Sequence, residues 1–112
     1  MSKRDIKLLL EDILESINRI EEYTLQMEFD DFTNNQLVFD GVVRNLEIIG
    51  EASTKIPTEF KEKTKNIPWR EIRGLRNRII HEYFGIDISI VWYIIKQELP
   101  QFKIEIQKAI TS

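Results

Sequence analysis

The chain has 112 residues and a net charge of −3, and its 42% hydrophobic and 31% charged residues are typical of one globular domain spanning 1–112. It has no cysteine, which excludes a disulfide framework and a thiolate zinc site. No apolar run approaches the roughly 20 residues that cross a bilayer, and the N-terminus lacks a secretory pattern, so we expect a cytoplasmic protein without membrane contact. The acidity restricts any contact with nucleic acid to a local basic patch.

Apolar residues recur at helical spacing through the first half of the chain. Isoleucine and leucine return every three or four residues from about residue 3 to 28, after Ser2 and Asp5 as a start signal. Residues 29–35 are predicted to form a loop that ends in cap residues. A second helix follows, with one apolar face from Val38 to Ile56.

Prolines punctuate the next part of the chain. Pro57 and Pro68 leave room for one short helix, at about Thr58 to Lys63. A fourth helix is predicted from Pro68 or Trp69 to near Gly85, which would serve as its C-terminal cap.

A fifth helix completes the predicted fold. Asp87 is placed to cap it, and Pro100 is expected to kink it before it continues to the end of the chain. No stretch alternates with period two for long enough to predict a sheet. The expected architecture is an all-α antiparallel bundle of four to five helices.

The predicted fourth helix carries the chemistry. It holds the single histidine of the chain, His81, close to a group of arginines: Arg70, Arg73, Arg76 and Arg78. The planar guanidinium fork matches the oxygens of a phosphate. Imidazole can take and give a proton near neutral pH. This combination is typical of a site for phosphate chemistry.

A helical wheel divides these residues between two faces. At about 100° per residue, Arg76 lies about 40° from Ile72, inside the apolar stripe. An arginine on a packed face requires a partner, because an unpaired buried charge is costly. Asn77 and His81 share a polar flank with the other arginines. Asn45 is similarly unusual, since it is polar in the middle of the apolar face of the second helix.

Each feature taken singly also has a structural explanation. His81 is compatible with a surface or structural histidine, and the arginines with a solvated face. Arg76 could join two helices through a buried ion pair, and Asn45 could satisfy a helix–helix hydrogen bond. Tyr83 lies on the apolar stripe and could be a core aromatic.

The combination resembles a known family. Arg76-x4-His81-x-Tyr83, with Asn77 directly after the arginine, is similar to the motif of HepT-like toxins in the HEPN superfamily. The resemblance extends over about residues 37–100. It includes these further stretches: Arg44 to Ala52, Trp69 to Asn77, Ile86-Asp87 and Val91-Trp92.

This resemblance implies a dimeric helical bundle that acts as a metal-independent ribonuclease, the toxin of a type VII toxin–antitoxin system. Its usual partner is MntA, a minimal nucleotidyltransferase antitoxin that adenylylates the motif tyrosine. Carried onto this chain, Arg76 and His81 would be catalytic, Asn77 would support them, and Tyr83 would receive AMP. The family also suggests tRNA as a substrate.

The residues themselves agree with such chemistry. Cleavage by the ribose 2′-hydroxyl needs a base, an acid and cations, but no metal and no cofactor. One histidine per chain cannot fill both proton-transfer roles, whereas a twofold homodimer brings two copies of His81 into one cleft. Arg70, Arg73 and Arg78 are then expected to bind RNA. The alternatives are a non-catalytic nucleotide- or substrate-binding partner of a minimal nucleotidyltransferase, and a dimeric scaffold.

Overall fold

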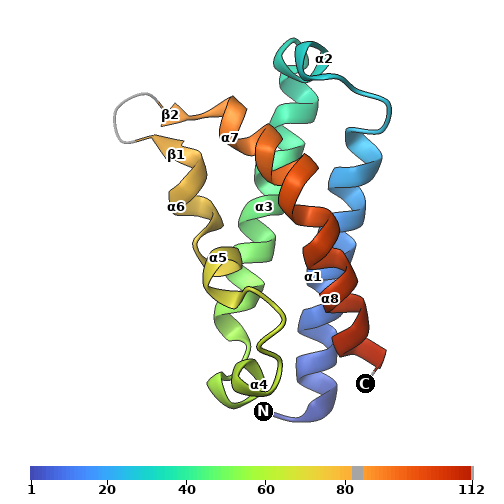
Figure 1. The fold of residues 1–112 in the computed structure, drawn as a ribbon, viewed down its shortest axis with the longest axis vertical. Coiled ribbons are helices and arrows are strands. Elements are labelled where there is room, and N and C mark those ends of the chain that lie inside the picture. The colour runs from blue at the N-terminus through green and yellow to red at the C-terminus, as the bar shows by residue number, and fades with distance from the viewer. Residues whose placement is uncertain (82–84, 112) are drawn as a thin grey trace.

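The computed structural model describes residues 1–81 and 85–111, and of His81 the backbone alone (Figure 1). The elements in chain order are α1 (Lys3–Tyr23), α2 (Phe29–Thr33), α3 (Gln36–Lys55), α4 (Thr58–Lys63), α5 (Trp69–Arg73), α6 (Leu75–Ile79), β1 (Ile80–His81), β2 (Gly85–Ile86), α7 (Ile88–Tyr93), the π-helical η1 (Ile94–Glu98) and α8 (Leu99–Thr111). The long helices α1, α3 and α8 run along the long axis of the molecule, α5 and α6 lie along α3, and the β1–β2 hairpin projects away from the bundle (Figure 1). The predicted all-α helical fold is confirmed.

Helix α1 begins where the sequence predicts and ends earlier. The Ser2 hydroxyl accepts from the Asp5 amide at 3.1 Å, and the Asp5 carboxylate accepts from the Ser2 amide at 3.3 Å, which forms a capping box. The helix ends at Tyr23, so the predicted end at about residue 28 is wrong. Gln26 has a φ of 64°, in the left-handed region that a right-handed helix cannot continue through.

The next elements mix confirmed and corrected predictions. A short helix, α2, stands where a loop was expected, because Phe32 is fully buried and holds this turn against the bundle. The Asn35 side chain accepts from the Val38 amide at 3.0 Å and starts α3, as predicted. Helix α4 spans the predicted residues.

The single fourth helix predicted over residues 68–85 is wrong. It is divided at Gly74, whose φ of −83° and ψ of 2° leave the helical region, consistent with the low helix propensity of glycine. Helix α6 then stops at Ile79, because Ile80 has a ψ of 120° and enters the extended region that β-branched residues favour.

A short hairpin replaces the end of that helix. Strand β1 pairs with β2 antiparallel, with Ile80 opposite Ile86 and His81 opposite Gly85. Gly85 has a φ of +81°, a conformation that glycine adopts at little cost. Gly85 therefore belongs to the hairpin, and its predicted role as a helix cap is wrong.

The C-terminal arm is helical without a break from α7 to α8. The Asp87 side chain accepts from the Ser89 amide at 3.0 Å and caps α7, as predicted. Helix α8 continues through Pro100, and the irregularity lies in the preceding turn, η1, which ends at Glu98, two residues before the proline. Proline donates no backbone hydrogen bond and its ring crowds the carbonyl of the preceding turn, so a widened turn relieves the conflict.

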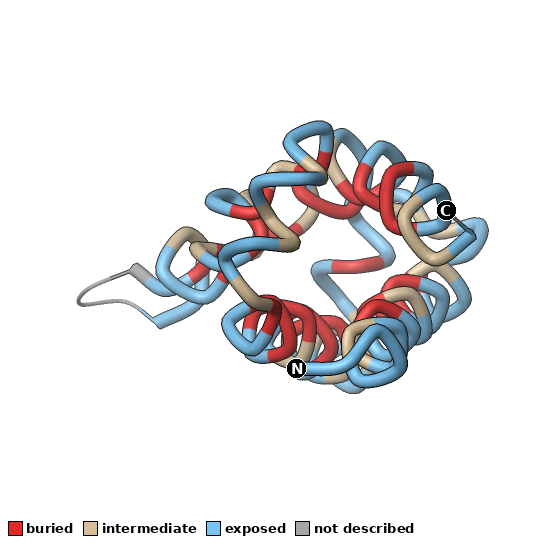
Figure 2. Tube along the Cα trace, turned by 90° about the horizontal axis from the view of Figure 1, so that it is seen from below, coloured by how far each residue is buried: buried red, intermediate tan, exposed pale blue. Residues whose placement is uncertain are grey.

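The core lies between the long helices. Figure 2 shows the molecule end-on, with buried residues on the sides of the helices that face one another. On α1 the fully buried residues are Ile13, Ile17 and Ile20, at the spacing that predicted the helix. In the described ranges, 1–81 and 85–111, no helix is long and apolar enough to cross a bilayer.

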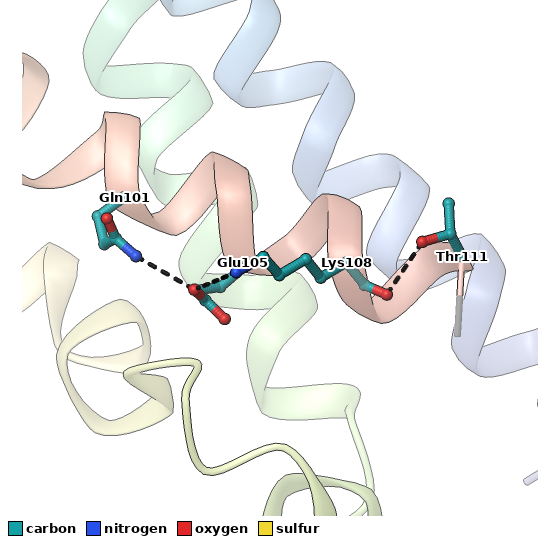
Figure 3. Close-up of polar contacts among 4 residues, drawn as sticks. All are labelled: Gln101, Glu105, Lys108 and Thr111. Carbon is teal, nitrogen blue, oxygen red and sulfur yellow. Dashed lines mark hydrogen bonds and ion pairs between the residues drawn. The ribbon is translucent and has the colours of Figure 1, made fainter.

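One carboxylate on α8 is almost buried. Glu105 on α8 has 11% of its side chain exposed. Its Oε1 accepts a hydrogen bond from the side-chain amide Nε2 of Gln101 at 3.1 Å. The Lys108 ammonium lies 3.5 Å from the same oxygen, and the Thr111 hydroxyl donates to the Lys108 carbonyl at 3.2 Å (Figure 3). The charge of Glu105 is thus compensated within its own helix.

Candidate active site

The motif arginine lies on the surface of α6. Leu75 and Ile79 are fully buried and attach this short helix to the bundle, whereas Arg76 is exposed. None of the ion pairs between described residues includes Arg76. The expectation that Arg76 leans into the packed face is therefore wrong. The division at Gly74 ends the continuous stripe on which that expectation depended.

The other motif residues come directly after Arg76 in the chain. Asn77 is exposed beside Arg76 on α6. His81 lies in β1, which begins directly after α6, and its backbone pairs with Gly85. The backbone of His81 therefore lies two residues beyond the end of α6. Tyr83, the expected AMP acceptor, lies outside the described residues.

Arg78 is held by a carboxylate from the C-terminal arm. Its Nη1 donates to Glu98 Oε1 at 2.7 Å and its Nη2 to Oε2 at 2.5 Å, a bidentate pair between α6 and η1. Hydrogen bonding to Glu98 raises the pKa of Arg78. The exposed fractions are 34% for the Arg78 side chain and 19% for that of Glu98. This pair ties the motif helix to the arm.

The remaining arginines of the cluster belong to α5. Arg70 and Arg73 are exposed, and neither forms an ion pair with a described residue. Burial and the positive charge of Arg73 lower the pKa of Lys61 on α4. The Lys61 ammonium lies 5.8 Å from the ring centroid of Trp69. Lys61 and Arg70 line one hollow, together with the carboxylates Glu62 and Glu71.

Comparison with known proteins shows the family of this chain. The family model described as "Ribonuclease HepT-like" matches residues 13–109. The chain belongs to the HepT-like ribonuclease family. It is 50% identical to "Putative RNase MJ1380" of Methanocaldococcus jannaschii, over 96% of this chain and 98% of that protein. It is 44% identical to "Probable ribonuclease HepT" of Thermococcus cleftensis, over 95% of this chain and 96% of that protein. No solved structure matches the chain.

The α3 stretch from Arg44 to Ala52, which resembles the family pattern, has one side that lines a groove and one side that is buried. Arg44, Glu47 and Glu51 line a groove of about 420 Å³ between α1 and α3. Asn45 points inward and is 4% exposed; its Nδ2 donates to the Gly41 carbonyl at 2.8 Å. That bond lies within α3, so the described part of the chain shows no helix–helix bond from Asn45. Its Oδ1 has no partner there.

Sequence reasoning missed one residue beside the HepT-like motif. Glu98 lies 20 positions after Arg78, and no local pattern connects them. The signal that could have found it is Pro100, which predicts an irregular turn in the preceding residues. Nothing in the sequence indicates that this turn faces α6.

Proposed function

We propose that this HepT-like chain is a toxin that cleaves RNA as a metal-independent endoribonuclease, with Arg76 and His81 as catalytic residues. The observation that carries the proposal is the exposed Arg76, which has no ion-pair partner among the described residues, on a helix that leads directly into the strand of His81. Asn77, exposed beside Arg76, would orient the phosphate.

The chemistry needs no protein nucleophile. The ribose 2′-oxygen attacks the adjacent phosphorus and gives its proton to one imidazole. A bond forms between O2′ and phosphorus while the bond to the 5′-oxygen breaks, and a second imidazolium protonates that leaving oxygen. Proton transfer of this kind contributes about 10²–10⁴-fold in rate. Arg76 would stabilise the negative charge that gathers on the phosphorane oxygens.

Two imidazoles in one cleft require two copies of the chain. Ile80 and Ile86 lie opposite each other in the hairpin and are 43% and 37% exposed. We propose that a twofold homodimer covers this apolar pair and places the two His81 residues in one composite cleft. Mixing equal amounts of wild type and His81→Ala tests this, because a shared cleft would leave about one quarter of the activity and independent subunits about one half.

The cations on α5 would hold the RNA backbone. Arg70 and Arg73 are exposed, and Lys61 adds a third charge. Arg78 has five N–H donors, of which Glu98 engages two. Its remaining donors would be available to a phosphate of the RNA backbone. Replacing a contacting arginine by alanine should lower the slope of log K against log[salt] by about 0.7 for single-stranded RNA.

We further propose that the toxin acts in the cytoplasm as part of a type VII toxin–antitoxin system, silenced by an MntA-like nucleotidyltransferase. AMP on Tyr83, two residues after His81, would set a negative phosphate against the arginines. Tyr83→Phe should stay toxic when the antitoxin is co-expressed. Tyr23→Phe, at an exposed tyrosine on α1, is the matched control and should be silenced like wild type.

Cleavage is tested with purified protein, single-stranded RNA and a chelator. Wild type should produce 2′,3′-cyclic phosphate and 5′-hydroxyl ends, and His81→Ala and Arg76→Ala should leave the RNA intact. Arg19→Ala is the matched control, because Arg19 is an exposed arginine on α1 that pairs with Glu15. Intact RNA with wild type would favour the non-catalytic nucleotide-binding alternative, and activity lost only with the chelator would overturn metal independence.

A further inference from the structure

An aromatic hollow lies apart from the motif residues. It has a volume of about 700 Å³, within the usual range for ligand sites, and is lined by Met27, Glu28, Phe29, Ser89, Trp92, Tyr93, Lys96 and Gln97. One wall comes from the start of α2 and the residues before it, and the other from α7 and η1. Nothing in the proposed chemistry uses these side chains.

One aromatic ring of this hollow, that of Trp92, packs against neighbouring rings. Trp92 packs on the fully buried Phe32, with ring centroids 5.1 Å apart, and on Phe29 at 6.1 Å. The Lys96 ammonium lies 4.7 Å from the Trp92 ring centroid. Tyr93 is different, because 56% of it is exposed and its ring contacts no other described aromatic ring. A fixed aromatic wall thus adjoins a tyrosine with a free face.

Tyr93 also connects this hollow to the motif helix. Together with Ser89 it lines a second hollow of about 490 Å³, whose other walls are Arg78 and Ile90. Arg78 belongs to α6, which leads directly into β1 and the backbone of His81. A bound polymer strand that extends from the motif past Arg78 would therefore contact Tyr93 first and Trp92 next.

We propose that the aromatic hollow binds a nucleobase of single-stranded RNA, one that flanks the bond to be cut, with its plane stacked on Tyr93. Stacking accepts any base, because every base has a π-face, and Lys96 would meet the neighbouring phosphate. Gln97 offers both a donor and an acceptor for a base edge. This proposal rests on the proposed ribonuclease function and names a subsite for its substrate.

The charges of the hollow make the proposal specific. Lys96 is the cation on its η1 side and Glu28 the carboxylate on its α2 side, whereas Arg78 lines the adjoining second hollow. An RNA strand should therefore place its phosphates toward Lys96 and keep them from Glu28. Glu28→Gln should strengthen binding, while Lys96→Gln should weaken it. A purely apolar partner would respond to neither change.

The test measures binding of a fluorescent single-stranded RNA to full-length dimer carrying His81→Ala, so that the probe stays intact. Stacking is worth about 1–3 kcal/mol per base, so adding Tyr93→Ala should weaken binding roughly 5- to 150-fold. Tyr93→Phe keeps the ring and should bind like the parent. Duplex RNA offers no free base and should lose little with either variant.

Three outcomes would overturn the subsite. Tyr93→Ala could bind with unchanged affinity, or lose single-stranded and duplex RNA alike. It could also shift sedimentation to a lighter species, which would assign Tyr93 to an interface between copies. The proposed function is judged separately: wild type that cleaves RNA while Tyr93→Ala binds normally removes the subsite alone. Wild type that never cleaves, with Tyr93-dependent binding intact, removes the nuclease and leaves the subsite.

Discussion

The frame made by α1, α3 and α8 and the segment from α5 to β2 are built in opposite ways. The frame consists of long helices whose starts at Ser2 and Asn35 are capped by side chains, with isoleucines buried at regular steps. The α5 to β2 segment consists of two five-residue helices and two-residue strands, without a side-chain cap at either helix. Arg70, Arg73 and Arg76 are exposed on it, and Arg78 pairs with Glu98.

This difference teaches how one small domain separates stability from chemistry. The frame supplies apolar burial, which is the main favourable term in folding. The α5 to β2 segment is attached through a few buried side chains, Ile72, Leu75 and Ile79, and through the Arg78–Glu98 pair. We therefore expect substitutions in the two regions to affect different measurements.

The largest expected effect is on cleavage by the motif. Arg76→Ala should lower the RNA cleavage rate by at least about 100-fold, because a charge that stabilises the phosphorane is lost. The melting temperature should stay within a degree or two of wild type, since the side chain is exposed. Cleavage kinetics and calorimetry on the same preparation check both. A parallel fall in stability would show that the two regions are not separable.

The frame should show the reverse behaviour. Leu46→Ala on α3 removes a fully buried side chain and should cost about 2–5 kcal/mol of unfolding free energy. The control is Leu37→Ala on the same helix, where 84% of the residue is exposed; it should change stability by less than about 0.5 kcal/mol. Urea denaturation measures both. Per folded molecule, cleavage at low temperature should be unchanged in either variant.

The Arg78–Glu98 pair joins the two regions and should show an intermediate effect. Glu98→Gln should cost about 1 kcal/mol, a figure that allows for solvent screening at the partly exposed arginine. Glu15→Gln breaks an exposed pair with Arg19 and should cost only a few tenths, at most about 0.5 kcal/mol. A double-mutant cycle with Arg78→Ala measures the coupling. Coupling no larger than that of the Glu15 pair would contradict the joining role.

Two glycines are expected to show effects of opposite sign, neither larger than that of Glu98→Gln. Gly50→Ala on α3 places a Cβ 3.6 Å from the Ile72 carbonyl oxygen, an ordinary contact, and should gain up to about 1 kcal/mol in helix propensity. Gly85→Ala meets no atom of residues 1–81 and 85–111 within 4 Å, yet its φ of +81° should make alanine cost about 1 kcal/mol. Thermal melts of the two variants compare them directly. Equal signs would mean that the hairpin conformation does not determine the cost.

The frame was predictable because its signals are local. Caps at Ser2 and Asn35 and the apolar spacing of α1 act within a few residues, so the sequence predicts where α1 and α3 begin. The division at Gly74 was not predictable in the same way. A glycine inside a helical pattern only lowers helix propensity, and the packing of α5 and α6 against α3 decides the outcome.

The candidate site was predictable in its residue types and not in its contacts. The motif around Arg76 and His81 identifies the family, because the spacing of chemically active residues is written directly in the chain. The exposure of Arg76 and the pairing of Arg78 with Glu98 depend on the direction in which each helix turns. The hollow beside Tyr93 depends on α2, which the sequence indicated as a loop.

The π-helical turn η1 has a consequence for how this domain can change. A π-turn holds one residue more than the α-helical turn it replaces, and each residue of an α-helix turns the chain by about 100°. Deleting a single residue between Ile94 and Glu98 would therefore convert this turn to an α-helical one and leave Trp92 and Phe102 in nearly the same relative rotation. A deletion within α8, where no turn is widened, would instead rotate the residues after it by about 100° and disrupt their packing.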